Sequence, residues 1–234
     1  MAGDRKAALC GAVIVFDLDG TLVDTAPDLI GTLNVLLAEE GVAPLALAEA
    51  RPFIGRGARW MLERGFRAAE APLAPERVEP LFERFIARYN AHIADESQPF
   101  PGVVAALETL KGRGARLAVC TNKLTALSMN LLDALDLSRL FDAVVGADTA
   151  LAAKPDPRHL QAAITAAGGS KDRAIMVGDA ATDVGAARAA GVPLILVSFG
   201  YTETPAREFH PDILIDHFDE LPDACARLLG ACGS

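Results

Sequence analysis

The chain has few of the features that mark membrane-spanning, disulfide-stabilised or nucleic-acid-binding proteins. Apolar runs such as Cys10–Phe16 and Gly191–Val197 are far shorter than the roughly 20 residues that cross a bilayer. Only 4 of 234 residues are cysteines, and no two form a CxxC pair. The 22 basic residues are outnumbered by 31 acidic ones, giving a net charge of −9. We therefore expect no membrane or nucleic-acid partner.

The beginning of the chain superficially resembles a secretory signal, because Arg5 and Lys6 precede an apolar run. That run meets Asp17 and Asp19 without a convincing cleavage region, so we interpret it as a first β-strand. A chain of this size without a signal does not require disulfides. The expected compartment is a reducing cytoplasm.

Composition and periodicity indicate the fold. Hydrophobic residues make up 51% of the chain and charged residues 23%, as in globular proteins. Short apolar runs alternate with helical patterns, which predicts a doubly wound α/β domain with a mostly parallel, Rossmann-like sheet. The expected strands are Ala12–Phe16, Arg116–Cys120, Ala143–Val145, Ala174–Val177, Leu194–Val197 and Ile213–Ile215. The expected helices are Val103–Lys111, Leu124–Leu135, Arg158–Ala167 and Asp183–Ala190, the third capped by Asp156 with Pro157 in its first turn.

One long segment departs from this alternation. Thr25–Gln98 has no convincing strand and three helical patterns, at Asp28–Glu40, Ala58–Ala68 and Glu76–Ile93. Pro99-Phe100-Pro101-Gly102 then marks a return to the α/β pattern. We predict a core domain of residues 1–24 and 99–234 with an inserted α-helical cap domain at residues 25–98.

Carboxylates follow two of the expected strands. Residues two apart in an extended chain face the same side, so Asp17 and Asp19 can address one point at the sheet edge where α/β proteins bind ligands. Asp179 follows a second strand, and Asp183 comes four residues later. A cation would keep such carboxylates ionised, and oxygen donors without His or Cys favour Mg²⁺. The alternatives are a solvated Asp-Gly turn at Asp17–Asp24 and an Asp183 that only caps its helix.

Groups suited to phosphate follow other strands. Thr121 and Asn122 lie just beyond Arg116–Cys120, where a hydroxyl and backbone amides can bind phosphoryl oxygens. Lys154 precedes Pro155, which favours an extended loop. Each is ordinary turn or surface chemistry by itself. Together with the carboxylates they predict a phosphate site.

In this order, the segments resemble the four motifs of the haloacid dehalogenase-like hydrolase superfamily over nearly the whole chain. DxDGTLxD at Asp17–Asp24 is similar to the first motif, Thr121 to the second and Lys154 to the third. GDxxxD, with Asp179 and Asp183, is similar to the fourth. The resemblance implies a Mg²⁺-dependent phosphomonoester hydrolase whose helical cap selects the leaving group.

The same resemblance implies roles for the acidic residues. Asp17 would be the nucleophile that forms an aspartyl-phosphate, and Asp19 the general acid/base. Mg²⁺ would be bound by the side chains of Asp17 and Asp179 and the main-chain carbonyl of Asp19, with support from Asp183. Thr121 would bind phosphate, while Lys154 would steady Asp17 and the transferring group.

Within the superfamily the chain looks most like phosphoglycolate phosphatases. The segments that carry this likeness are DLDGTLVDTAPDL at Asp17–Leu29, TNK at Thr121–Lys123, KPDP at Lys154–Pro157 and Phe199-Gly200-Tyr201. The expected partner is thus a small phosphorylated metabolite, 2-phosphoglycolate or a similar compound. No pattern in the chain predicts an oligomeric state.

Several alternatives stay open. Phosphatases of sugar phosphates, nucleotides or pyrophosphate share this pattern, because specificity lies in a variable cap. Gly178-Asp179 replaces the Glu-Asp pair typical of β-phosphoglucomutases and makes a mutase less favoured. A phosphonatase would need a cap lysine, which Thr25–Gln98 does not contain, and Asp19 argues against a dehalogenase. A noncatalytic binding protein with the same fold is the alternative from a different class.

Two arginines in the expected cap suit the carboxylate of phosphoglycolate. They lie in the glycine-containing segment Ile54–Arg59, which can form a tight loop over the site. A planar guanidinium can donate two parallel hydrogen bonds to a carboxylate, and we expect Arg56 to make this contact. The alternative is that Arg56 and Arg59 both cover the cap's exterior, paired with acids such as Glu63.

Overall fold

The computed structural model describes residues 9–231 and contains a six-stranded sheet in the order β5-β4-β1-β6-β7-β8. All neighbouring strands are parallel. The strands are β1 (Val13–Phe16), β4 (Arg116–Cys120), β5 (Ala143–Val145), β6 (Ala174–Gly178), β7 (Leu194–Val197) and β8 (Ile213–Ile215). The predicted sheet is confirmed, with each strand end within one residue of the expected position. The expectation about Arg5 and Lys6 concerns positions outside the described residues.

The central strand determines where the site forms. Every residue of β1 is buried, as its unbroken run of β-branched and aromatic residues predicts for a strand covered on both faces. Phe16, the last residue of β1, lies opposite Val119 of β4 and Val177 of β6. This register brings the chain segments that follow these three strands to one edge of the sheet.

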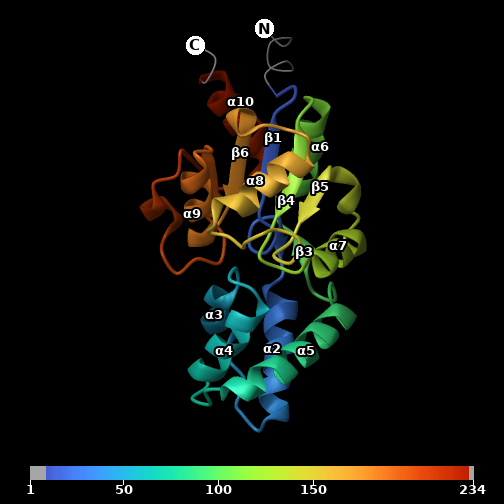
Figure 1. The fold of residues 1–234 in the computed structure, drawn as a ribbon, viewed down its shortest axis with the longest axis vertical. Helices are drawn as coiled ribbons and strands as arrows, with labels where there is room; N and C mark the ends of the chain where they lie inside the picture. Colours follow the sequence, from blue (N-terminus) through green and yellow to red (C-terminus); the bar gives the residue numbers. More distant parts are fainter. Residues whose placement is uncertain (1–8, 232–234) are drawn as a thin grey trace.

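Helices cover both faces of the sheet (Figure 1). One face packs against α6 (Val103–Gly112), α7 (Thr125–Ala134) and α10 (Leu221–Ala231), and the other against α8 (Pro157–Ala166) and α9 (Ala181–Ala190). The predicted start of α8 is confirmed, because the Asp156 carboxylate accepts a hydrogen bond from the Arg158 N–H at 2.9 Å. Short 3₁₀ turns lie at Arg51–Phe53, Ser138–Leu140, Lys171–Arg173, Ala206–Phe209 and Phe218–Glu220.

Four helices stand apart from the sheet at the bottom of Figure 1 and form the helical segment. They are α2 (Ala26–Glu39), α3 (Leu47–Ala50), α4 (Ala58–Ala68) and α5 (Pro75–Ala91). Their apolar faces bury a core of their own, which includes Leu33, Leu62, Phe66 and Phe85. No helix within residues 9–231 is both long enough and apolar enough to cross a membrane.

The helical segment joins the α/β part through a small antiparallel pair of strands, β2 (Val23–Asp24) and β3 (Gln98–Pro99). Neither strand is predicted by the sequence, because two residues carry no alternation of polar and apolar side chains. Helices α3 and α10 are not predicted either. The pair holds the two connecting chains side by side directly below the sheet edge.

Candidate active site

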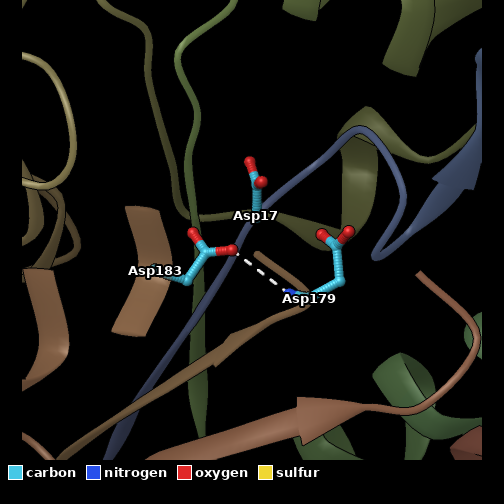
Figure 2. A group of neighbouring side chains, drawn as sticks. All are labelled: Asp17, Asp179 and Asp183. Carbon is cyan, nitrogen blue, oxygen red and sulfur yellow. Dashed lines mark hydrogen bonds between the residues drawn. The ribbon is translucent and has the colours of Figure 1, made fainter. Parts of the chain in front are cut away.

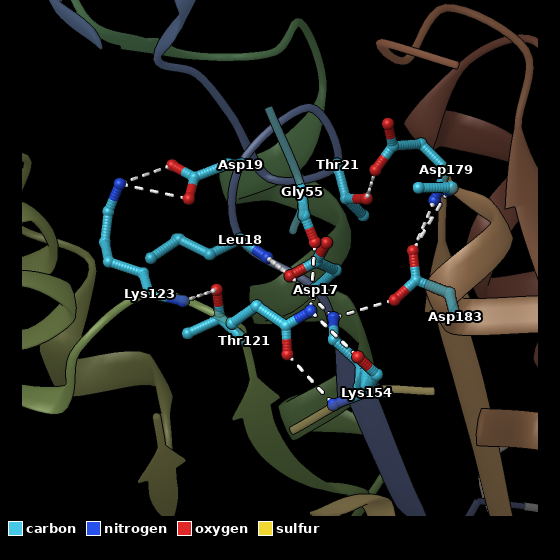
Figure 3. A network of polar contacts seen from close by, with 12 residues as sticks. Asp17, Leu18, Asp19, Thr21, Gly55, Thr121, Lys123, Lys154, Asp179 and Asp183 are labelled. Carbon is cyan, nitrogen blue, oxygen red and sulfur yellow. Dashed lines mark hydrogen bonds and ion pairs between the residues drawn. The ribbon is translucent and has the colours of Figure 1, made fainter. Parts of the chain in front are cut away.

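The edge of the sheet gathers most of the candidate residues (Figure 3). Asp17 follows β1, Thr121 follows β4 and Asp179 follows β6. Lys154 comes from the loop before α8, and Asp183 from the first turn of α9. All five side chains are buried. The geometry therefore brings these five predicted residues together.

Lys154 joins two carboxylates. Its Nζ lies 2.8 Å from Asp17 Oδ1 and 2.7 Å from Asp183 Oδ1. Burial alone would lower the pKa of this lysine, but the two carboxylates raise its pKa above the ordinary value. Lys154 therefore carries a full positive charge beside Asp17.

Three carboxylates form an acidic cluster (Figure 2). One oxygen from each of Asp17, Asp179 and Asp183 lies within 4.8 Å of the others. Burial, followed by the ammonium and carboxylate neighbours, leaves the pKa of Asp17 raised to about 7. Burial and repulsion from Asp183 and Asp17 raise the pKa of Asp179 to about 8. With Lys154 as the adjacent cation, the ionised cluster keeps two excess negative charges, and its oxygen donors fit a divalent cation such as Mg²⁺.

Asp179 is held by groups that come from far along the chain. The Thr21 hydroxyl donates to Asp179 Oδ1 at 2.8 Å, and the Tyr201 N–H donates to Oδ2 at 2.8 Å. Gly20, with φ +84°, allows the close approach, since a Cβ there would lie 2.8 Å from Asp179 Oδ2. In the first motif, Gly20 thus allows the backbone turn and Thr21 orients the Asp179 carboxylate.

Asp183 acts in both ways that its sequence position allows. Its Oδ2 accepts the Asp179 and Ala180 N–H groups at 3.2 and 3.0 Å, at the start of α9. Its Oδ1 contacts Lys154 and faces the acidic cluster. The helix-capping alternative is therefore observed together with a place in the site.

Asp19 points away from the acidic cluster and toward Lys123 (Figure 3). Lys123 Nζ lies 2.7 and 3.0 Å from the two carboxylate oxygens, and the Thr25 hydroxyl donates to Oδ1 at 2.7 Å. Lys123 and Thr25 are not among the site residues predicted from the sequence. The available signal was a lysine two residues beyond Thr121.

Thr121 and Asn122 lie at the end of β4. The Thr121 hydroxyl accepts the Lys123 N–H at 3.2 Å and keeps its own proton to donate. The Asn122 side chain accepts the Lys154 N–H and donates to the carbonyls of Lys154 and Gly55, so its amide is occupied by protein groups. Its backbone N–H has no acceptor within residues 9–231, so that group can donate a hydrogen bond to a ligand.

A cavity of about 260 Å³ lies between the helical segment and the sheet edge. At one end it is lined by Asp17, Asp19, Thr121 and Lys123. The rest of its wall is largely apolar and includes Leu29, Ile54, Met61, Phe82, Phe85 and Ile86. A small ligand bound at Asp17 would have its far end within reach of the helical segment.

The two predicted arginines line this cavity, in different arrangements. Arg59 lies over the Phe82 ring and pairs with Glu79 at 2.8 Å, so the acid in this pair is Glu79 and not Glu63, which the alternative gave as an example. Arg56 is exposed and lies 5.1 Å from the centre of the Trp60 ring. No carboxylate in the described part of the chain forms an ion pair with Arg56, which leaves its guanidinium available to a ligand.

Comparisons with known proteins agree with this geometry. The family model of haloacid dehalogenase-like hydrolases matches residues 14–197. The chain is 58% identical to a phosphoglycolate phosphatase of Caulobacter vibrioides, covering 96% of this chain and 94% of that protein. It is 46% identical to a phosphoglycolate phosphatase of Agrobacterium fabrum, covering 94% of each. A predicted phosphoglycolate phosphatase from Haemophilus somnus has a similar crystal structure, with a TM-score of 0.84, 28% identity and coverage of 91% and 97%.

Proposed function

Because the chain belongs to the haloacid dehalogenase-like hydrolase family, we propose that it hydrolyses 2-phosphoglycolate through an aspartyl-phosphate on Asp17. The observation that carries this proposal is the buried pairing of Asp17 with Lys154 at the inner end of the cavity. A carboxylate at that place can attack a phosphate ester, since the neighbouring ammonium offsets the repulsion between two anions.

The first step uses the two oxygens of Asp17 differently. Oδ1 accepts the Leu18 N–H at 2.7 Å and contacts Lys154, while no donor within residues 9–231 hydrogen-bonds to Oδ2. Oδ2 is therefore the oxygen that attacks phosphorus in line with the departing alkoxide. The Thr121 hydroxyl and the Asn122 backbone N–H hold the phosphoryl oxygens during transfer.

Asp19 moves the proton in both steps. It donates a proton to the glycolate oxygen as the P–O bond breaks, and then removes one from the water that attacks the aspartyl-phosphate. The residue lines the same cavity as Asp17, two positions along the chain. One carboxyl group at one place can serve both steps because the leaving oxygen and the attacking water occupy the same position.

Asp17, Asp179 and Asp183 are the residues that would hold Mg²⁺, together with the Asp19 carbonyl. When bound, the ion supplies positive charge that lowers the repulsion among phosphate and carboxylates. The residues fit this group because the cluster has two uncompensated negative charges, only oxygen donors and raised carboxyl pKa values.

We expect activity to require a divalent cation. The apparent affinity for this cation should decrease as the pH is lowered. Protons compete with the ion for carboxylates whose pKa values are about 7 and about 8. Phosphate release after chelator treatment should stop and return with Mg²⁺, and the half-saturating Mg²⁺ concentration should rise between about pH 8 and about pH 6. Undiminished turnover in excess chelator would refute the metal requirement.

The helical segment is proposed to act as a cap that selects the leaving group. The largely apolar wall of the cavity offers few hydrogen-bond partners to the hydroxyls of a sugar phosphate. This wall disfavours the alternative of a sugar-phosphate phosphatase. The guanidinium of Arg56 at the cavity offers one partner to a carboxylate. A small phosphate ester that carries a carboxylate fits both features.

Arg56→Ala should raise KM for 2-phosphoglycolate by roughly 10-fold or more, since a charge-assisted hydrogen bond contributes about 1.5–3 kcal/mol. A neutral aryl phosphate should show little change. Arg64→Ala is the matched control, because Arg64 also lies over an aromatic ring, that of Phe53 at 5.2 Å, but does not line the cavity. An equal rise in KM for both substrates, or no rise for either, would show that Arg56 does not recognise the carboxylate.

The function itself is tested by ranking phosphorylated metabolites by kcat/KM, with and without Mg²⁺. We expect 2-phosphoglycolate to rank first, ahead of sugar phosphates, nucleotides and pyrophosphate. A higher value for any of those would transfer the assignment to that substrate class. Binding without hydrolysis of any ester would instead support the noncatalytic alternative.

A further inference from the structure

Lys123 is a second buried lysine at the site, and it has no role in the mechanism proposed so far. Its side chain is 5% exposed and reaches the carboxylate of Asp19 rather than the acidic cluster. It comes from the loop after β4, where it follows the phosphate-binding candidates Thr121 and Asn122. A buried ammonium is costly unless it is paired, so this position indicates a specific purpose.

The second partner of Lys123 comes from the helical segment. The hydroxyl of Tyr89, near the end of α5, accepts a hydrogen bond from Lys123 Nζ at 3.1 Å. The same ammonium lies 4.7 Å from the centre of the Tyr89 ring. Tyr89 is itself buried and stacks on Phe85 at 6.1 Å. The ammonium is therefore bonded to a residue that is buried in the core of the helical segment.

The contacts of Asp19 complete the connection. Oδ1 receives hydrogen bonds from Lys123 and the Thr25 hydroxyl, and Oδ2 receives one from Lys123. A lysine side chain has four rotatable bonds, and its contact with one carboxylate would fix it poorly. Tyr89 supplies the second fixed point, so that the carboxylate, the ammonium and the phenol hold one another in place.

We propose that Lys123, anchored by Tyr89, is a positioning residue that holds the Asp19 carboxyl where it exchanges protons with the leaving oxygen. This inference rests on the proposed function. It makes the helical segment part of the proton-transfer apparatus in addition to its part in substrate selection. The Asp19 carboxyl is then correctly positioned for proton transfer only when α5 packs against the loop after β4.

The expected signature is a dependence on the leaving group. An alkoxide needs a proton as it departs, whereas 4-nitrophenolate departs well without one. The constant kcat/KM reports the steps up to loss of the leaving group, whichever later step limits kcat. A positioning defect at Asp19 should therefore lower kcat/KM for ethyl phosphate and 2-phosphoglycolate much more than for 4-nitrophenyl phosphate.

The experiment compares Lys123→Met, Tyr89→Phe and the control Lys111→Met with the unmodified protein. Lys111 is a partly exposed lysine that pairs with Asp142 at 3.3 Å, away from the site. We expect Lys123→Met to lower kcat/KM for the two alkyl esters by roughly 100-fold and for the aryl ester by less than about 10-fold. Tyr89→Phe, which keeps the ring and loses only the hydroxyl, should shift the same ratio by about 3- to 10-fold, while Lys111→Met should not shift it.

If Lys123→Met lowered kcat/KM equally for the alkyl and aryl esters, Lys123 would have only a structural role. An unchanged ratio of alkyl to aryl kcat/KM in both Lys123→Met and Tyr89→Phe would overturn the proposal. Thermal unfolding of each variant is measured beside the kinetics. If Lys123→Met does not fold, the ratio in Tyr89→Phe decides. Failure of the proposed function is distinguishable, because it appears in the unmodified protein itself, either as no phosphate release from 2-phosphoglycolate or as a higher kcat/KM for another substrate class, whereas this proposal is decided by the alkyl-to-aryl ratio of the variants relative to the unmodified protein.

Discussion

Asp17→Asn protein should fold normally and lose turnover by roughly four orders of magnitude or more, the scale of loss on removing a catalytic nucleophile. The amide keeps the size of the side chain, and its oxygen can still accept the hydrogen bonds that Asp17 Oδ1 receives from Leu18 and Lys154. It has no negative charge with which to attack phosphorus. The measurement is Mg²⁺-dependent phosphate release from 2-phosphoglycolate.

Stability provides the control for Asp17→Asn. The pKa of Asp17 is about 7 in the folded protein and 3.8 as its ordinary value, so the folded state binds the proton more tightly. The ionised carboxylate therefore lowers stability as pH rises from about 4 to about 7, and this cost is fully present above pH 7. The neutral amide avoids the cost, and Lys154 keeps its pairing with Asp183. Near pH 8 and without divalent cations, the unfolding temperature of Asp17→Asn should match or exceed that of the unmodified protein. Near-normal turnover by Asp17→Asn would show that Asp17 is not the nucleophile.

Asp19→Asn should slow both formation and hydrolysis of the aspartyl-phosphate by roughly 100- to 10,000-fold, the usual contribution of general acid/base catalysis. The amide can accept from Lys123 and Thr25 but cannot exchange a proton at neutral pH. Rapid mixing with 2-phosphoglycolate measures glycolate and phosphate release separately. Altered Mg²⁺ affinity with unchanged rates at saturating Mg²⁺ would make Asp19 a ligand and not the acid/base.

The α/β core and most of the site could be predicted from local patterns. Buried parallel strands appear as short apolar runs, and the ends of β1, β4 and β6 meet at one edge. The positions of Asp17, Thr121 and Asp179 follow from that rule alone. Their proximity needed no knowledge of how the helices pack.

Other features depend on tertiary contacts that no local pattern contains. Lys123 meets Tyr89 and Asp19, which are 34 and 104 positions away in the chain. Arg59 and Glu63 are spaced for an ion pair along one helix, but packing of α4 against α5 places Arg59 over Phe82 and beside Glu79. Such contacts follow from the assembled fold and could not be predicted before it.

Trapping the phosphorylated enzyme tests the proposed mechanism most directly. Asp19→Asn protein is mixed with Mg²⁺ and 2-phosphoglycolate, quenched in acid and treated with borohydride, which reduces an aspartyl-phosphate to homoserine. We expect homoserine at Asp17 and at no other aspartate, and none in a sample without substrate. Glycolate release with no modification of Asp17, or modification of another residue, would contradict the proposed mechanism.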